Sequence, residues 1–176
     1  VYVGSNELSP FHDCYANKDT VLRLAAGRYF AHFNGDDPIE TYWALRRNAA
    51  VYDVPERPVE ITGPDVLAFL EHIFSRNISD MKIGRGRYAI ACTFNGGLFM
   101  DGILLWLTED RFWYVHPDGD LDTWLLAHRE GYNITITDPR SRVLQVQGPK
   151  SYKIMSGASN GQVDHKILYF HSPFVT

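Results

Sequence analysis

One acidic residue lies in an otherwise apolar run of the sequence, and it is the first candidate for chemistry. Asp101 lies within residues 98–105, where every other residue is apolar or glycine. A carboxylate without a partner in such surroundings costs several kcal/mol. Asp101 must therefore be partnered, be protonated, or lie at a cavity where a ligand supplies the partner. Asp101-Gly102 is also typical of a turn or bulge, and the residues alone leave both interpretations open.

Two other side chains are candidates to act near Asp101. Tyr88 comes within its reach if the two apolar runs pair, and a tyrosine there could stack on an aromatic ligand or simply pack. His116 ends an apolar run beside a turn, where histidine is commonly a surface residue. The other histidines show no metal-ligand spacing, so we expect no metal site.

Common catalytic and binding motifs are absent from the sequence. It contains no G-x-G-x-x-G, no G-x-x-x-x-G-K-[ST] and no G-x-S-x-G. Cys14 and Cys92 lie far apart and have no Cys/His spacing, which argues against a disulfide framework and a structural zinc site. Neither cysteine has a matching histidine arrangement, so covalent nucleophilic catalysis is not expected. A basic cluster at Lys82, Arg85 and Arg87 could meet an anionic tail of a substrate or simply form a solvated face.

The composition is that of a folded, mildly acidic protein. Of 176 residues, 45% are hydrophobic and 14% aromatic, which excludes a disordered or collagenous chain. The formal net charge of -4 argues against nucleic acid or an anionic membrane as a partner. The longest apolar stretch falls far short of the roughly 18 residues that span a bilayer. With no visible signal peptide, we expect a cytoplasmic protein, or a mitochondrial matrix protein in a eukaryote.

A β-hairpin is predicted to position Asp101. Residues 87–94 and 98–107 are strand-like and are joined by Asn95-Gly96-Gly97. Asn-Gly between apolar runs is the strongest short hairpin signal, because both turn positions need a positive φ. A third strand is expected at residues 112–116. Tyr88 and Asp101 then lie on paired strands.

Helices and further strands are expected to alternate around this hairpin. Helices are predicted at 39–50 with Asp36 or Asp37 as cap, at 66–77 with Asp65 as cap, and at 121–128 after Asp120. Strands are predicted at 22–24, 29–30, 59–62, 133–137, 143–147 and, from an apolar run, 167–170. This order favours an α+β fold with a mixed or antiparallel sheet and packed helices over a doubly wound parallel one.

Five segments of the sequence together carry a family resemblance. They are, in chain order, Tyr52-Asp53-Val54, residues 59–65, residues 82–88, residues 95–101 and Gln147-Gly148-Pro149. In this order they resemble the N-terminal portion of the tetrahydrofolate-dependent aminomethyltransferases, the glycine-cleavage T-protein family. The resemblance covers residues 39–152, and residues 51–61 and 147–151 are closest to the branch similar to dimethylsulfoniopropionate demethylase. It implies an N-terminal extended segment with the first strands over 1–38 and a folate-binding domain over 39–176, truncated at its C-terminal end.

The resemblance also implies roles for individual residues. Asp101 corresponds to the carboxylate that faces the pterin and the reactive N5 of tetrahydrofolate, which makes it the expected catalytic residue. Tyr88 corresponds to a tyrosine that lines the folate site, and Ile103 and Tyr114 to residues that pack on the pterin. His116 is included in the cofactor-binding set.

Two departures from the family pattern bear on the substrate. Met100 stands where the family usually has Asp, and His116 where it has Asn. We therefore expect a retained pterin pocket with an altered substrate side. The family is longer and carries an Arg-Thr-Gly-Tyr-Thr-Gly-Glu-like segment without a counterpart here. Since the chain begins at Val1 and stops at Thr176 soon after an apolar run, we expect a fragment.

The expected function is a tetrahydrofolate-dependent aminomethyltransferase, methyltransferase or demethylase acting on a small amine or sulfonium. Its expected partners are a small-molecule one-carbon donor and either a carrier protein or the missing C-terminal half. One alternative is a non-catalytic folate-binding or partner-binding module on the same scaffold. Another is an unrelated α+β domain in which Asp101-Gly102 is only a bulge.

Overall fold

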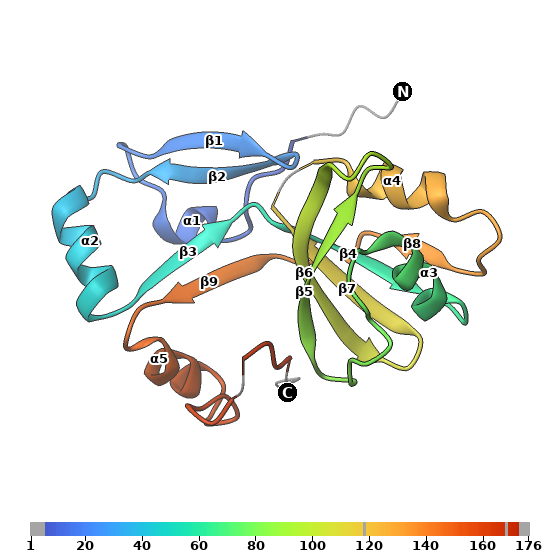
Figure 1. Ribbon diagram of the computed structural model, residues 1–176. Coiled ribbons are helices and arrows are strands. Elements are labelled where there is room, and N and C mark those ends of the chain that lie inside the picture. The colour runs from blue at the N-terminus through green and yellow to red at the C-terminus, as the bar shows by residue number, and fades with distance from the viewer. Residues whose placement is uncertain (1–5, 118, 168, 173–176) are drawn as a thin grey trace. The chain divides into compact units, whose positions relative to one another are not determined.

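Short strands and helices alternate along the chain in the computed structural model, which describes residues 6–117, 119–167 and 169–172 (Figure 1). The helices are α1 (His12–Tyr15), α2 (Pro38–Arg47), α3 (Val66–Ile73), α4 (Leu121–His128) and α5 (Ser151–Ala158). The strands are β1 (Val21–Ala25), β2 (Arg28–Phe33), β3 (Ala50–Val54), β4 (Arg57–Thr62), β5 (Gly86–Cys92), β6 (Leu98–Thr108), β7 (Arg111–His116), β8 (Thr135–Thr137) and β9 (Val143–Gln147). All pairings between these strands are antiparallel, so the predicted α+β class with an antiparallel sheet is confirmed.

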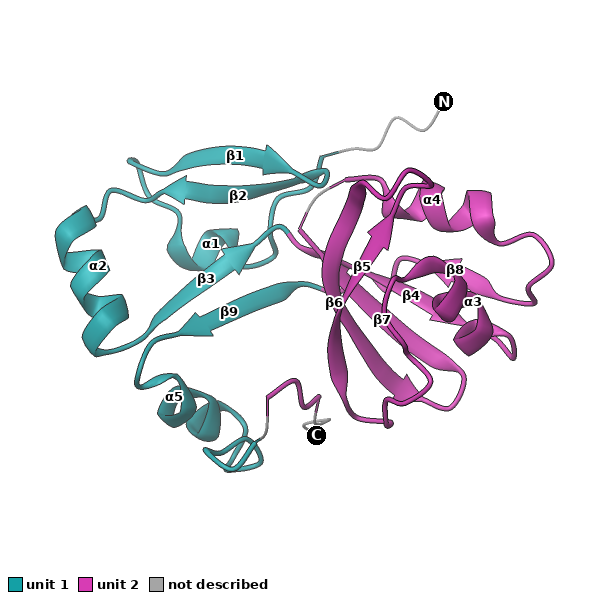
Figure 2. Cartoon of the chain, in the orientation of Figure 1, with its two compact units in different colours: residues 1–55, 142–167, 174–176 teal, residues 56–141, 168–173 magenta. Residues whose placement is uncertain are grey.

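The chain divides into two compact units (Figure 2). Unit 1 comprises residues 1–55, 142–167 and 174–176, and unit 2 comprises residues 56–141 and 168–173. The chain leaves unit 1 after Pro55 and returns to it at Arg142. The boundary expected between residues 38 and 39 falls at the start of α2, inside unit 1.

Unit 2 is built on a five-stranded sheet with the order β5-β6-β7-β4-β8. Its strands alternate between buried and half-buried residues, which is the period of a sheet that buries one face more than the other. On the face that we call the core face, β6 contributes the buried Met100 and Leu104, which cluster with Phe69 of α3 and Leu125 of α4. The opposite face carries Asp101 and is called the Asp101 face below.

Unit 1 contains two small antiparallel sheets, β1-β2 and β3-β9, together with α1, α2 and α5. Helix α2 begins as the sequence predicts. Asp37 is its N-cap and accepts hydrogen bonds from the backbone N–H groups of Ile39 at 2.8 Å and Glu40 at 2.9 Å. Pro38 follows at the first helical position, where its missing N–H costs nothing.

Three local predictions differ from the structure. The Asp65 carboxylate does not cap α3, because it accepts the backbone N–H of Asn133 at 2.7 Å instead. That helix stops at Ile73, since Phe74 is extended and bridges to Ala91 of β5. Residues 169 and 170 form a turn rather than a strand, and Leu168 of the same apolar run lies outside the described residues.

None of the helices in the described residues combines the length and apolar character that crossing a bilayer requires.

Candidate functional site

A tight turn at Asn95-Gly96-Gly97 joins β5 to β6 and sets the frame for Asp101. Gly96 has a φ of 82°, in the left-handed region that favours glycine. The backbone N–H of Thr93 donates to the carbonyl of Gly97 at 2.8 Å, and the N–H of Gly96 donates to the carbonyl of Thr93 at 2.9 Å. The predicted hairpin and the position of its turn are confirmed, but only Gly96 has the positive φ that was expected at both Asn95 and Gly96.

Asp101 and Gly102 lie inside β6 and form neither a turn nor a bulge. Asp101 pairs with Ile90 and Gly102 with Ala89 in regular antiparallel register. The irregularity of this ladder falls between Ala91 and Cys92, which leaves Phe99 of β6 as the extra residue. Of the two roles that the sequence left open, the turn or bulge interpretation of Asp101-Gly102 is therefore wrong.

Tyr88 supplies the partner that the Asp101 carboxylate requires. Its hydroxyl donates a hydrogen bond to Oδ2 of Asp101. Tyr88 lies directly opposite Ile103, so its phenol reaches diagonally along the same face of the sheet. The hydrogen bond to Asp101, with burial and the negative charge of Asp101 adding to it, raises the pKa of Tyr88. The phenol therefore stays protonated at neutral pH and remains a donor.

Tyr114 lies on the core face, behind the strand that carries Asp101. Its side chain is 0% exposed, and its hydroxyl donates to the backbone carbonyl of Ala89 at 2.8 Å. A Cβ atom on Gly102 would lie 2.9 Å from Cζ of Tyr114 and 2.4 Å from the carbonyl oxygen of Val115. Gly102 thus makes room for the ring, which anchors β5 beside Tyr88. Burial, followed by the negative charge of Asp101, raises the pKa of Tyr114.

His116 also faces the core, because it follows Tyr114 by two residues along β7. It is 3% exposed, and its ring is stacked on that of Tyr114 with centroids 6.2 Å apart. It lies near Asp122, whose pKa burial raises although Arg57 and His116 act in the opposite direction. The core face is therefore polar at this end of β7.

The five residues predicted for the site fall into two groups. The structure brings Tyr88, Asp101 and Ile103 together on the Asp101 face and places Tyr114 and His116 on the core face. Met100 is buried on the core face as well. Met100 and His116, the two departures from the family pattern, both lie on the core face. The face that carries Asp101 therefore gives no support to the expected change on the substrate side.

The basic cluster is largely engaged in contacts within unit 2. Arg87 bonds the carboxylate of Asp80 and the carbonyl of Asn77, and Arg85 contacts the ring of His171. Lys82 is exposed. Within the described residues, no group of three or more His, Cys, Asp or Glu side chains is placed to hold a metal ion.

A polar cluster on the Asp101 face went unnoticed in the sequence. Glu60 of β4 accepts hydrogen bonds from Nε of Arg111 and, at 2.7 Å, from Nε1 of Trp113. These bonds and the charge of Arg111 outweigh the raising effect of burial and lower the pKa of Glu60. Only the pairing of Glu60 with Trp113 could have indicated this cluster. That pairing requires knowing that β4 and β7 are neighbours, which the sequence does not show.

Comparison with solved structures identifies the class of fold. Glycine cleavage system aminomethyltransferase T from Bartonella henselae matches with a TM-score of 0.81 and 21% sequence identity, over 95% of this chain and 47% of that one. This likeness shows a shared fold. The family model "GCVT N-terminal domain" matches residues 17–174, and the chain belongs to this family. The predicted family resemblance is confirmed.

Curated relatives include proteins with several printed activities. The aminomethyltransferase of Corynebacterium jeikeium is 28% identical over 84% of this chain and 42% of its own length. Dimethylsulfoniopropionate demethylase DmdA of Ruegeria pomeroyi is 32% identical over 72% of this chain and 35% of its own. Trimethylamine-oxide aldolase of the same organism is 31% identical over 82% of this chain and 19% of its own. The chain thus spans less than half the length of these relatives.

Proposed function

We propose that this chain is the folate-binding part of a tetrahydrofolate-dependent one-carbon transferase. The observation that carries the proposal is the hydrogen bond from Tyr88 to Asp101, which orients one carboxylate on a strand with apolar neighbours. Membership of the GCVT N-terminal domain family and the names of the relatives support it. The proposal places folate binding within residues 39–176, which include all of unit 2.

The side chains on the Asp101 face fit a flat heteroaromatic ring that bears N–H groups. Tyr88 occupies Oδ2 of Asp101, and no hydrogen bond within the described residues engages Oδ1, which leaves an acceptor for a ligand donor. Tyr88 is 40% exposed and offers part of its ring for stacking. Ile103, directly opposite Tyr88, adds half-buried apolar surface.

Each residue then has a distinct task. Tetrahydrofolate, when bound, supplies the amine that accepts the one-carbon unit. Asp101 is the proposed catalytic residue, which stabilises positive charge next to that amine or accepts a proton from it. Tyr88 fixes the orientation of the Asp101 carboxylate. Tyr114 and His116 act from the core face, through the packing that holds β5 and β6 in place.

The one-carbon donor is proposed to be a small amine or sulfonium. The relatives' names include an aminomethyltransferase and a dimethylsulfoniopropionate demethylase, which covers both chemical classes. A carrier protein, or chain beyond the part described, is proposed as the partner that completes the site, since these relatives are more than twice as long as the matched region.

Anaerobic calorimetric titration of tetrahydrofolate into the intact protein tests the proposal, with oxidised folate as ligand control. We expect binding at about micromolar affinity and a loss of about tenfold or more in Asp101→Asn, since a charged acceptor is removed. The matched control is Asp13→Asn, an exposed aspartate of α1 in unit 1. Absence of binding to a protein of confirmed full length would overturn the folate assignment, and full turnover in Asp101→Asn would overturn the role of Asp101.

A further inference from the structure

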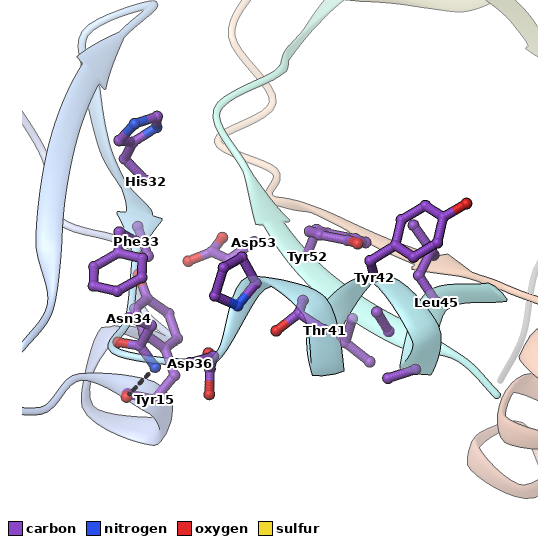
Figure 3. A pocket seen from close by; sticks show the side chains of 15 residues that line it. Tyr15, His32, Phe33, Asn34, Asp36, Thr41, Tyr42, Leu45, Tyr52 and Asp53 are labelled. Carbon is purple, nitrogen blue, oxygen red and sulfur yellow. Dashed lines mark hydrogen bonds between the residues drawn. The ribbon is translucent and has the colours of Figure 1, made fainter. Parts of the chain in front are cut away.

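Unit 1 contains a pocket of its own, which has no part in the site around Asp101 (Figure 3). Its volume is about 670 Å³, within the range of small-molecule sites. Residues of α1, β2, α2 and β3 and of the loop after β2 line it. Three stretches of the sequence, at residues 15, 31–45 and 50–53, thus form one cavity.

The pocket has aromatic walls that are open rather than packed away. Tyr15, Phe33, Tyr42 and Tyr52 all contribute to the lining. Phe33 is 47% exposed and Tyr42 is 52% exposed, so the core does not cover these rings. The face of an aromatic ring carries negative charge density and attracts cations.

The charged groups of the lining are acidic. Asp36 and Asp53 belong to it, whereas no lysine or arginine does. His32 is the one remaining titratable nitrogen base among the lining residues. This charge favours a cationic ligand and disfavours an anionic one.

Two polar groups in the pocket have few partners. Oδ2 of Asp53 and the hydroxyl of Tyr15 are hidden from solvent, and neither makes a well-formed hydrogen bond within the described residues, although the two groups interact with each other. Figure 3 shows the Asp53 side chain extending from β3 toward the side of the pocket that Tyr15 and Phe33 form. Leaving a buried carboxylate oxygen without a donor is costly, and a ligand that brings a positive charge removes that cost.

Taken together, these features define the class of ligand. We propose that the unit 1 pocket binds a small alkylammonium cation, with Asp53 as the counter-charge and with Phe33 and Tyr42 contacting its alkyl groups. A neutral apolar ligand would leave the Asp53 carboxylate without a counter-charge in the pocket. A bare metal ion would need three or more ligating side chains, and no such group exists among the described residues.

Calorimetric titration of choline into the intact protein tests this proposal. Its neutral analogue of the same shape, 3,3-dimethylbutan-1-ol, is titrated in parallel. We expect choline to bind at millimolar concentration or below and the neutral analogue to bind about tenfold more weakly, because only choline carries charge. Equal affinities for the two probes, or no binding of choline, would overturn the proposal.

Matched variants assign the binding to this pocket. Asp53→Asn keeps the shape and removes the charge, so choline affinity should fall about tenfold, whereas Asp13→Asn on the exposed surface of α1 should leave it unchanged. Tyr42→Leu keeps apolar volume without the ring and should weaken binding about threefold, which preserves the test if Asp53→Asn does not fold. Choline affinity unchanged in both variants contradicts the proposal. Tetrahydrofolate titration of the same variants should give the wild-type affinity, so the outcome is independent of the proposed function.

Discussion

Tyr88 and Asp101 are joined by a hydrogen bond although neither is the other's direct neighbour across β5 and β6. The residue opposite Tyr88 is Ile103, and the residue opposite Asp101 is Ile90. A tyrosine side chain is long enough to cover this diagonal step, whereas a shorter hydroxyl side chain is not. The carboxylate is therefore held by a group two residues along the strand, and the surface above Ile103 stays available.

Replacing Tyr88 by phenylalanine should weaken tetrahydrofolate binding about threefold to tenfold, because the Asp101 carboxylate loses the hydrogen bond that orients it. The effect should be smaller than that of Asp101→Asn. Calorimetry checks both variants, with Tyr169→Phe, whose side chain is 81% exposed, as the control. A Tyr88→Phe protein with wild-type affinity would show that the pair does not position the cofactor.

A methyl group at position 102 should destabilise the protein. In Gly102→Ala the new Cβ would meet the carbonyl oxygen of Val115 and the ring of Tyr114, both of which are part of the sheet and core. We expect a loss of about 3 kcal/mol in the free energy of unfolding, the upper end for overpacking. Urea denaturation measures it.

Gly157→Ala is the matched control for that substitution. Gly157 lies in α5 and has nothing within 4 Å of the added methyl group. Alanine there should stabilise the helix by about 0.5–1 kcal/mol. Equal effects of the two substitutions would contradict the close approach of β7 to Gly102.

Local signals account for what the sequence predicted well. The Asn95-Gly96-Gly97 turn, the cap at Asp37 and the strand at 112–116 each depend on a few adjacent residues, and the structure contains all three. The turn alone does not account for the contact of Tyr88 with Asp101. The irregularity between Ala91 and Cys92 shifts the register by one residue, and this shift places both side chains on the same face of the sheet.

Features that depend on strand neighbours could not be predicted in this way. Tyr114 lies opposite Leu104, which places it on the core face. This register includes an irregularity between Trp106 and Thr108 that no local sequence signal indicates.

The unit 1 pocket could not be predicted from local signals either. Tyr15 and Asp53 lie 38 positions apart in the sequence and meet only in the folded chain, and nothing around either residue indicated the other as its neighbour.

Acid should remove a stabilising contribution of Glu60. The pKa of Glu60 lies below its ordinary value of 4.5 in the folded protein, because hydrogen bonds from Trp113 and Arg111 outweigh burial. Because the folded pKa is lowered, the stabilising contribution of the Glu60 carboxylate is present above pH 4.5 and is lost as the pH falls through the folded pKa. The free energy of unfolding of Glu60→Gln should therefore be lower than that of wild type by about 1 kcal/mol at neutral pH, and this difference should be smaller at about pH 3.

Denaturant unfolding at a series of pH values measures this difference. Glu109→Gln serves as control, since Glu109 is exposed in the turn between β6 and β7. A gap between wild type and Glu60→Gln that stays constant from neutral to acid pH would contradict the assignment.

Alkaline pH should destabilise unit 1 through Tyr15. Burial, followed by the negative charge of Asp53 and a hydrogen bond to its carboxylate, raises the pKa of Tyr15 from 10.0 to about 12. A raised folded pKa means that the stabilising contribution is complete below pH 10.0 and is lost as the pH rises toward about 12, because the unfolded chain releases the proton first. Tyr15→Phe has no proton to release and should lose less stability than wild type over this interval. Unfolding followed by circular dichroism over this pH interval checks the expectation, with Tyr152→Phe on α5 as the control. Parallel loss of stability in wild type and Tyr15→Phe would show that Tyr15 ionises as readily in the folded protein as in the unfolded chain.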